Sequence, residues 1–165
     1  MKTHKTAGGG MCAALCMVML FAASFIPNIK IAFMFASSLV MGICILRYKT
    51  AVAAVVYAAV SLLSLFIIPN KLISLIFVSV FGIYPIIKLY IEKLSNITVE
   101  YVIKFIMWNI QLVVLYVIFC ALGQDSFRDF GMLLVWIAGL FILCLYDFAF
   151  GIVINAFYKT YSKYL

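Results

Sequence analysis

Residues 50–72 read TAVAAVVYAAVSLLSLFIIPNKL, and this stretch contains the pattern that decides the fold. Residues 50–68 carry no charged side chain, and apolar residues resume directly after the Pro-Asn-Lys sequence at 69–71. A bilayer core of about 30 Å is crossed by roughly 20 helical residues. Proline fixes the backbone φ angle and asparagine bonds its own backbone, so both favour a turn. The stretch therefore predicts one membrane-spanning helix, a tight turn and the start of another.

The composition of the whole chain agrees with this prediction. Hydrophobic residues make up 68% of the 165 residues and charged residues 10%, and the mean hydropathy is +1.26. Soluble domains carry about 45–50% apolar and about 25% charged residues. A chain of this length has too little interior to bury so much apolar side chain. We therefore expect an all-α integral membrane protein whose surface lies against the lipid bilayer.

The same pattern recurs and predicts six transmembrane helices in a single domain, residues 1–165. The predicted spans cover approximately residues 7–26, 29–46, 50–68, 72–90, 99–122 and 130–156. The connections between them are short, and short connections make sequential helices neighbours. We expect a compact helical bundle without a separate soluble domain.

The basic residues predict the orientation, because Lys and Arg collect on the cytoplasmic side of membrane proteins. With a cytoplasmic N-terminus, nine of them fall inside and three outside. The inner group is Lys2, Lys5, Arg47, Lys49, Lys88, Lys93, Lys104, Lys159 and Lys163, and the outer group is Lys30, Lys71 and Arg128. This bias predicts cytoplasmic N- and C-termini, in a bacterial cytoplasmic membrane.

Several classes of function are disfavoured. The net charge is +7, but the basic residues are scattered rather than clustered, so we expect no nucleic-acid partner. The five cysteines lie in apolar runs without a CxxC pair, and the one histidine is His4, so we expect no metal site and no cofactor. The chain has no HExxH, GxSxG or P-loop sequence, so we expect no catalytic residues and no enzyme.

Polar residues in the predicted outer connections form a candidate solute-binding set. Its members are Asn28, Lys30, Asn70, Gln124, Asp125 and Arg128. The richest connection is residues 124–129, which either binds a solute or is a solvated loop in which Asp125 pairs with Arg128. The turns FIPNIK at 25–30 and IIPNKL at 67–72 are alike, either as repeated hairpins or as two similar tight turns.

Four polar residues fall inside predicted spans, and such residues are functional candidates by default. They are Lys104, Asn109, Gln111 and Asp147. Lys104, the indole of Trp108 and Gln111 stand at positions i, i+4 and i+7, so they share one helix face. This face lines a polar cavity or bonds a neighbouring helix, and both roles are open. We expect Asp147 to pair with Lys104 or Lys88.

Residues 81–93, FGIYPIIKLYIEK, form the inner end of the fourth span. Pro85 removes a backbone hydrogen bond, and with Gly82 nearby it predicts a bend. Lys88 is expected at the inner interface, where its long side chain reaches water. This segment is a candidate face for a cytoplasmic partner.

The first span carries small residues at four-residue spacing, namely the pairs Gly9/Ala13 and Gly10/Ala14. Such pairs let another helix approach closely. Six helices in a chain of this length, with small residues at this spacing in the first, resemble the S component of energy-coupling-factor transporters. The segment YPIIKLYIEK is also similar to one in small bacterial membrane proteins without an assigned activity.

The resemblance implies that the first helix docks on a membrane T component driven by two ATPase subunits, and that a solute site faces outward. The solute itself is not implied. We therefore expect a subunit that binds a small solute, a vitamin or similar, for uptake with an ATP-driven partner. The alternative is a non-transport membrane scaffold of the MreD type in cell-envelope assembly. A solute-binding subunit requires the outer polar residues to surround a closed cavity, whereas a scaffold does not.

Overall fold

The computed structural model describes residues 2–92, 97–122 and 132–162, and every regular element in these ranges is a helix. The main helices are α1 (Lys2–Phe25), α2 (Lys30–Tyr48), α3 (Thr50–Ile67), α4 (Lys71–Ile76), α5 (Tyr84–Ile91), α6 (Ile97–Ala121) and α7 (Met132–Ser162). A short 3₁₀ turn, η1 (Pro27–Ile29), joins α1 to α2, and a π-helical segment, η2 (Phe77–Phe81), follows α4.

Six helical stretches in the described ranges are long and apolar enough to cross a membrane. They are Thr6–Phe25, Lys30–Tyr48, Thr50–Ile67, Lys71–Ile91, Thr98–Ala121 and Leu134–Phe157. Each falls on one predicted span, so the all-helical class and six helices of membrane-spanning length and apolarity are confirmed for these residues. The last helix differs most, because α7 continues beyond the predicted end at 156 to Ser162. No proline or glycine stands between these two positions to end it.

The chain forms two compact units, which we describe separately. The first unit comprises residues 1–90 and 154–165, and the second comprises residues 91–153. The prediction of a single transmembrane domain stays a prediction.

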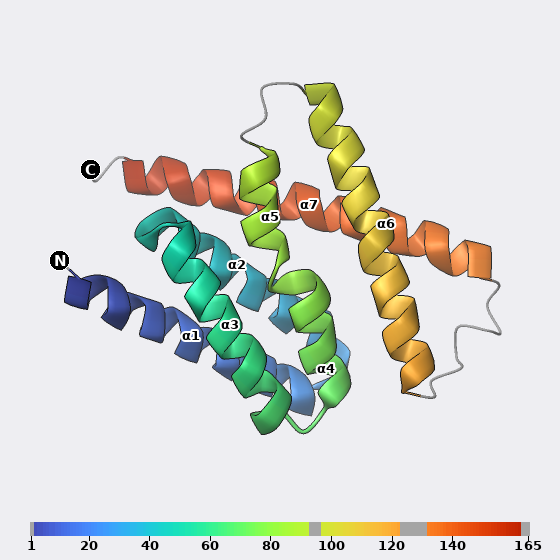
Figure 1. Cartoon of the computed structure of the whole chain (residues 1–165), viewed down its shortest axis with the longest axis horizontal. Coiled ribbons are helices and arrows are strands. Elements are labelled where there is room, and N and C mark those ends of the chain that lie inside the picture. The colour runs from blue at the N-terminus through green and yellow to red at the C-terminus, as the bar shows by residue number, and fades with distance from the viewer. Residues whose placement is uncertain (1, 93–96, 123–131, 163–165) are drawn as a thin grey trace. The chain divides into compact units, whose positions relative to one another are not determined.

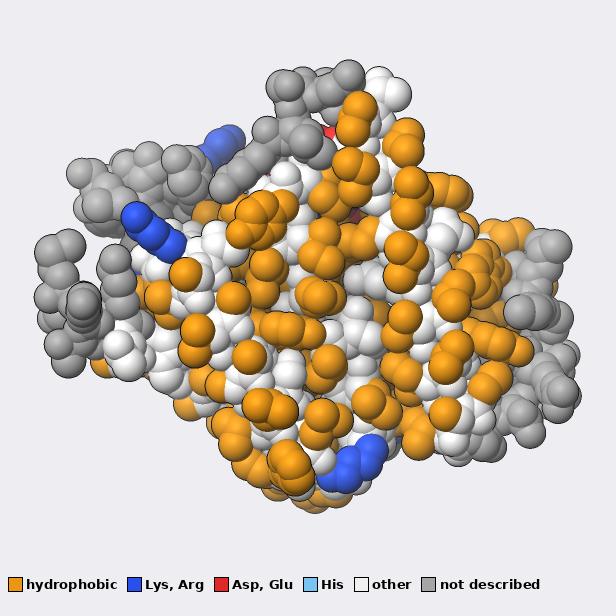
Figure 2. Space-filling view, in the orientation of Figure 1, with side chains coloured by type: hydrophobic (Ala, Val, Ile, Leu, Met, Phe, Trp, Pro, Cys, Tyr) orange, Lys and Arg blue, Asp and Glu red, His pale blue; other side chains and the backbone are white. Residues whose placement is uncertain are grey.

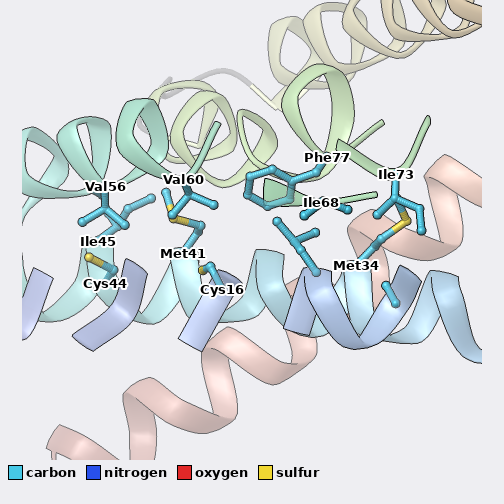
Figure 3. Close-up of a cluster of buried hydrophobic side chains, with 13 residues drawn as sticks. Cys16, Met34, Met41, Cys44, Ile45, Val56, Val60, Ile68, Ile73 and Phe77 are labelled. Carbon is cyan, nitrogen blue, oxygen red and sulfur yellow. The ribbon is translucent and has the colours of Figure 1, made fainter. Parts of the chain in front are cut away.

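In the first unit α1, α2 and α3 pack against one another (Figure 1). Figure 3 shows Val56 and Val60 of α3 turned toward Ile45 and Met41 of α2. Cys16 and Cys44 are fully buried in the same cluster. These two thiols therefore pack as small apolar side chains, which is the common role of a buried free cysteine.

Buried serines in this unit bond to backbone carbonyls. Ser37 Oγ donates to the Met34 carbonyl at 2.7 Å, and Ser74 Oγ donates to the Ser64 carbonyl at 2.8 Å. The second of these bonds joins α4 to α3. Hydroxyl groups buried in an apolar interior need such partners, because an unpaired one is costly.

The fourth span is interrupted where the sequence predicts a bend. The Gly82 N–H bonds the Phe77 carbonyl five residues back, at 2.7 Å, instead of the Val78 carbonyl four residues back. After this π-helical segment the chain turns and α5 begins at Tyr84 (Figure 1). Pro85 then lies in the first turn of α5, where its missing N–H costs no helical hydrogen bond. The break therefore precedes the proline.

In the second unit α6 and α7 meet at three places. Lys104 lies against Asp147, Asn109 bonds Trp136, and the Leu112 side chain covers Gly139. The two helices cross each other rather than lying side by side along their length (Figure 1). A Cβ at Gly139 would lie 2.6 Å from Leu112 Cδ2. A larger residue at this position would therefore require the Leu112 side chain to move.

The surface differs from that of a water-soluble protein. Large apolar residues are exposed on every membrane-length helix, and Phe66, for example, is 83% exposed. Figure 2 shows apolar side chains spread over the visible face. By contrast, Lys104 is only 5% exposed and Gln111 4%. Soluble proteins almost never bury lysine while exposing contiguous apolar surface.

Candidate functional site

The most polar cluster in the described residues is centred on Lys104 of α6. Its ammonium Nζ lies 2.7 Å from Glu100 Oε1, 3.4 Å from Asp147 Oδ2 and 3.8 Å from Glu92 Oε1. The expected pair between Lys104 and Asp147 is therefore present, at hydrogen-bond distance. A buried ammonium group needs such partners, because removing an unpaired charge from water is costly.

The two glutamates of this cluster were not identified from the sequence, although one signal was available. Glu100 precedes Lys104 by four residues, and a glutamate four residues before a lysine is the favourable order on a helix. Glu92 lies outside α6 in the sequence, so no helical spacing predicts its contact. Lys88, the other expected partner of Asp147, is buried in the first unit with its Nζ 5.9 Å from the centre of the Tyr84 ring.

The predicted polar face of α6 is its buried face. Lys104 and Gln111 are its most buried residues, whereas Ile106, Ile110 and Val113 are about half exposed. Both amide atoms of Gln111 and the indole Nε1 of Trp108 are buried without a hydrogen-bond partner in the described part of the chain. Polar groups in such positions are normally satisfied by protein, water or ligand.

Asn109 has a different role from Gln111. Its Nδ2 donates to the Phe105 carbonyl at 2.8 Å, and its Oδ1 accepts a hydrogen bond from Trp136 Nε1 at 3.2 Å. Asn109 therefore joins α6 to α7, which is the common use of asparagine between membrane helices. Of the two roles left open for the polar residues of this span, Asn109 takes the packing role.

The outer candidate residues are only partly within the described residues. Asn28 lies in η1 and is exposed, and Lys30 is the first residue of α2. Gln124, Asp125 and Arg128 lie outside the described residues.

Asn70 caps α4, because its Oδ1 accepts a hydrogen bond from the Leu72 N–H at 3.2 Å. The neighbouring Lys71 donates from Nζ to the carbonyls of Leu65 and Ile68 at the end of α3. The turn at 69–71 thus caps one helix and begins the next. These contacts explain Asn70 without a solute.

The two small-residue pairs of α1 face in different directions. A Cβ at Gly9 would lie 3.1 Å from Val52 and 3.4 Å from Val56, so Gly9 permits the close approach of α3. Ala13 packs against the same core. A Cβ at Gly10 would have no described atom within 4 Å, and Gly10 and Ala14 are both exposed. The first pair therefore serves packing within the unit, and the second faces outward.

The described residues contain no group of three or more His, Cys, Asp or Glu side chains arranged to hold a metal ion. Searches of protein-family models, of curated proteins and of solved structures find no match to this chain.

Proposed function

We propose that this protein is a multi-pass integral membrane protein of a bacterial cytoplasmic membrane, with both termini on the cytoplasmic side. The observation that supports insertion is the exposure of large apolar side chains such as Phe66, while Lys104 and Gln111 are buried. Lipid solvates such a surface, whereas water does not. The nine-to-three bias of basic residues supports the orientation.

Within that membrane, the protein is a solute-binding subunit that works with an ATP-driven partner, in the manner of an S component. The observation that carries this proposal is the outward position of Gly10 and Ala14 on α1. Gly10 has open space above it, so a partner helix can approach the α1 backbone there. The T component of an energy-coupling-factor transporter is a partner of this kind, with its ATPase subunits bound behind it.

The test is affinity purification in mild detergent, followed by mass spectrometry of proteins and co-purified small molecules. We expect a T component, ATPase subunits and a solute to be recovered with the natural chain. Gly10→Leu should fold but lose the partners, because its side chain fills the outward space. Val55→Leu, at an exposed position of α3, is the matched control and should retain them. The proposal would be contradicted if the natural chain and Val55→Leu also recovered no T component.

A membrane scaffold of the MreD type is the second candidate function. It is favoured by the contacts of Asn70 and its neighbour Lys71, since both side chains bond the ends of helices rather than an open site. In the same purification, a scaffold would recover cell-envelope assembly proteins without ATPase subunits or a solute.

A further inference from the structure

A stripe of polar groups runs along one face of α6, from the partly exposed Glu100 to the buried Gln111. Its members are Glu100, Lys104, Trp108 and Gln111, spaced by four, four and three residues, which keeps them on one face. The Glu100 side chain is 20% exposed, whereas Gln111 is 4% exposed. The stripe therefore leads from a partly solvated end to a fully buried one.

The length of the stripe matches half a membrane. From Glu100 to Gln111 the helix rises about 16 Å at 1.5 Å per residue, and the hydrocarbon core is about 30 Å thick. Gln111 thus lies near the middle of a span whose other faces carry exposed apolar residues such as Ile110 and Val113. A polar stripe of this length reaches the middle from one side only.

The end of the stripe at Trp108 and Gln111 carries hydrogen-bonding groups that lack partners among the described residues. Gln111 brings one acceptor and an NH₂ donor, and Trp108 brings an N–H donor. All of these atoms are buried and have no partner among the described residues. In an apolar interior this is costly, so a molecule with both donor and acceptor groups is expected there.

The charge of the neighbouring cluster selects the kind of molecule. Lys104 disfavours a cation next to it, and the carboxylates of Glu100 and Asp147 disfavour an anion. A neutral hydroxyl group meets the requirement, since its oxygen accepts from the N–H groups of Trp108 and Gln111 while its hydrogen bonds Gln111 Oε1. Water has this chemistry, and so do small alcohols and polyols.

We propose that the Lys104–Trp108–Gln111 face of α6 is a hydrated access path open at one side of the membrane. Its Gln111 end binds a neutral hydroxyl-bearing molecule, either water or a small polyol. The path opens at the Glu100 end, which is the cytoplasmic end in the orientation proposed above. This inference rests on the proposed membrane insertion, but not on transport or on any partner.

Cysteine labelling in membrane vesicles tests the path. In a chain whose five native cysteines are replaced by alanine, Gln111→Cys and Val113→Cys place thiols at similar depth on different faces. The probe is 2-hydroxyethyl methanethiosulfonate, which is neutral and reacts with thiolates in water and hardly with thiols in lipid. We expect Gln111→Cys to be modified at least about tenfold faster than Val113→Cys, since only the former contacts water.

The outcomes separate the inference from its premise. Slow modification at both positions would overturn the path while leaving membrane insertion intact. Fast modification at both would overturn insertion itself and the path with it. Trp136→Phe keeps Gln111 and leaves Trp108 as the single tryptophan, so glycerol distinguishes the occupants there. A change of Trp108 emission in glycerol that Gln111→Leu abolishes identifies a polyol site, and an unchanged emission identifies water.

A second measurement keeps the native cysteines. In Trp136→Phe, Trp108 is the remaining tryptophan, and contact of its N–H with solvent makes its emission stronger in D₂O than in H₂O. We expect this isotope effect in Trp136→Phe, a reduced effect when Gln111→Leu is added, and an unchanged effect when Val113→Leu is added. The absence of any isotope effect in folded Trp136→Phe protein would overturn the proposal.

Discussion

The hydroxyl of Tyr57 on α3 donates a hydrogen bond to the Val78 carbonyl at 2.9 Å, inside the π-helical segment of the fourth span. In an α-helix the Gly82 N–H would bond this carbonyl, but here it bonds Phe77 instead. The tyrosine thus satisfies the acceptor that the change of helix type releases. The interruption of the fourth span is therefore stabilised by a side chain from another helix.

Tyr57→Phe should destabilise the first unit by about 1 kcal/mol. The change removes only the hydroxyl, so Val78 keeps a carbonyl without its donor, and hydrogen bonds between membrane helices contribute about 0.6 kcal/mol on average and up to about 1.7. Unfolding in detergent, followed by circular dichroism, measures the effect. Tyr101→Phe is the matched control, because Tyr101 is exposed on α6. Equal losses in both variants would contradict the assigned role of Tyr57.

Gly82→Ala should destabilise by about 1–3 kcal/mol, the usual cost of forcing atoms into a filled space. A Cβ at Gly82 would lie 2.8 and 2.9 Å from two ring carbons of Tyr57. Gly10→Ala is the control, and it should be neutral or stabilising by up to about 1 kcal/mol because alanine favours a helix.

A double-mutant cycle assigns the cause of the Gly82 effect. Adding Tyr57→Ala removes the ring, so the further cost of Gly82→Ala in that background should fall well below its cost alone. Strictly additive losses would show that the ring is not the obstacle. Chemical denaturation of the four chains in one detergent supplies the comparison.

The sequence predicts the parts of this fold that depend on local pattern. The run from Thr50 to Ile68 predicts α3 because length and hydropathy are properties of one segment, and the face shared by Lys104 and Gln111 follows from helical spacing alone. The π-helical segment is not predictable in this way, since it depends on Tyr57, which is more than twenty residues distant from Val78. Tertiary contacts decide such local departures from α-helix.

Tertiary contacts also decide which candidate site residues have a packing role. The pairs Gly9/Ala13 and Gly10/Ala14 are equivalent in spacing, and only the position of α3 separates the packed pair from the outward one. A polar side chain in a predicted outer turn makes Asn70 a candidate for solute binding, but turn asparagines serve equally as helix caps. A polar residue beside Pro69 has a local structural role available, whereas Gln111 within an apolar span does not.

Asn70→Ala should cost about 1 kcal/mol, which is typical for loss of an N-cap. Asn70→Asp should retain most of the stability, since a carboxylate also accepts from the Leu72 N–H. Thermal unfolding of the purified variants checks both. If a co-purified solute is lost from Asn70→Asp while the stability is kept, Asn70 contacts the solute as well and the capping role is incomplete.

The losses caused by substitutions in the Lys104 cluster should follow the order of its distances. Lys104→Met should cost the most, about 3–5 kcal/mol of stability, because it removes the ammonium group that Glu100 and Asp147 share. Asp147→Asn should cost less, since Glu100 at 2.7 Å remains closer to the ammonium than Asp147 at 3.4 Å. Size-exclusion chromatography in detergent measures the folded yield. Lys104→Arg is the control, since it keeps the charge and should retain most of the yield.

A compensating change tests whether the charges, rather than the packing, decide this order. Lys104→Met removes the cation, so adding Asp147→Leu and Glu100→Gln removes two of the carboxylates that it contacts and should recover part of the yield. The recovery is expected because a buried ion cluster is often replaceable by apolar groups, while a broken one is not. If the triple variant is as poor as Lys104→Met alone, the loss of yield does not come from carboxylates that lack the Lys104 charge, and the electrostatic explanation is contradicted.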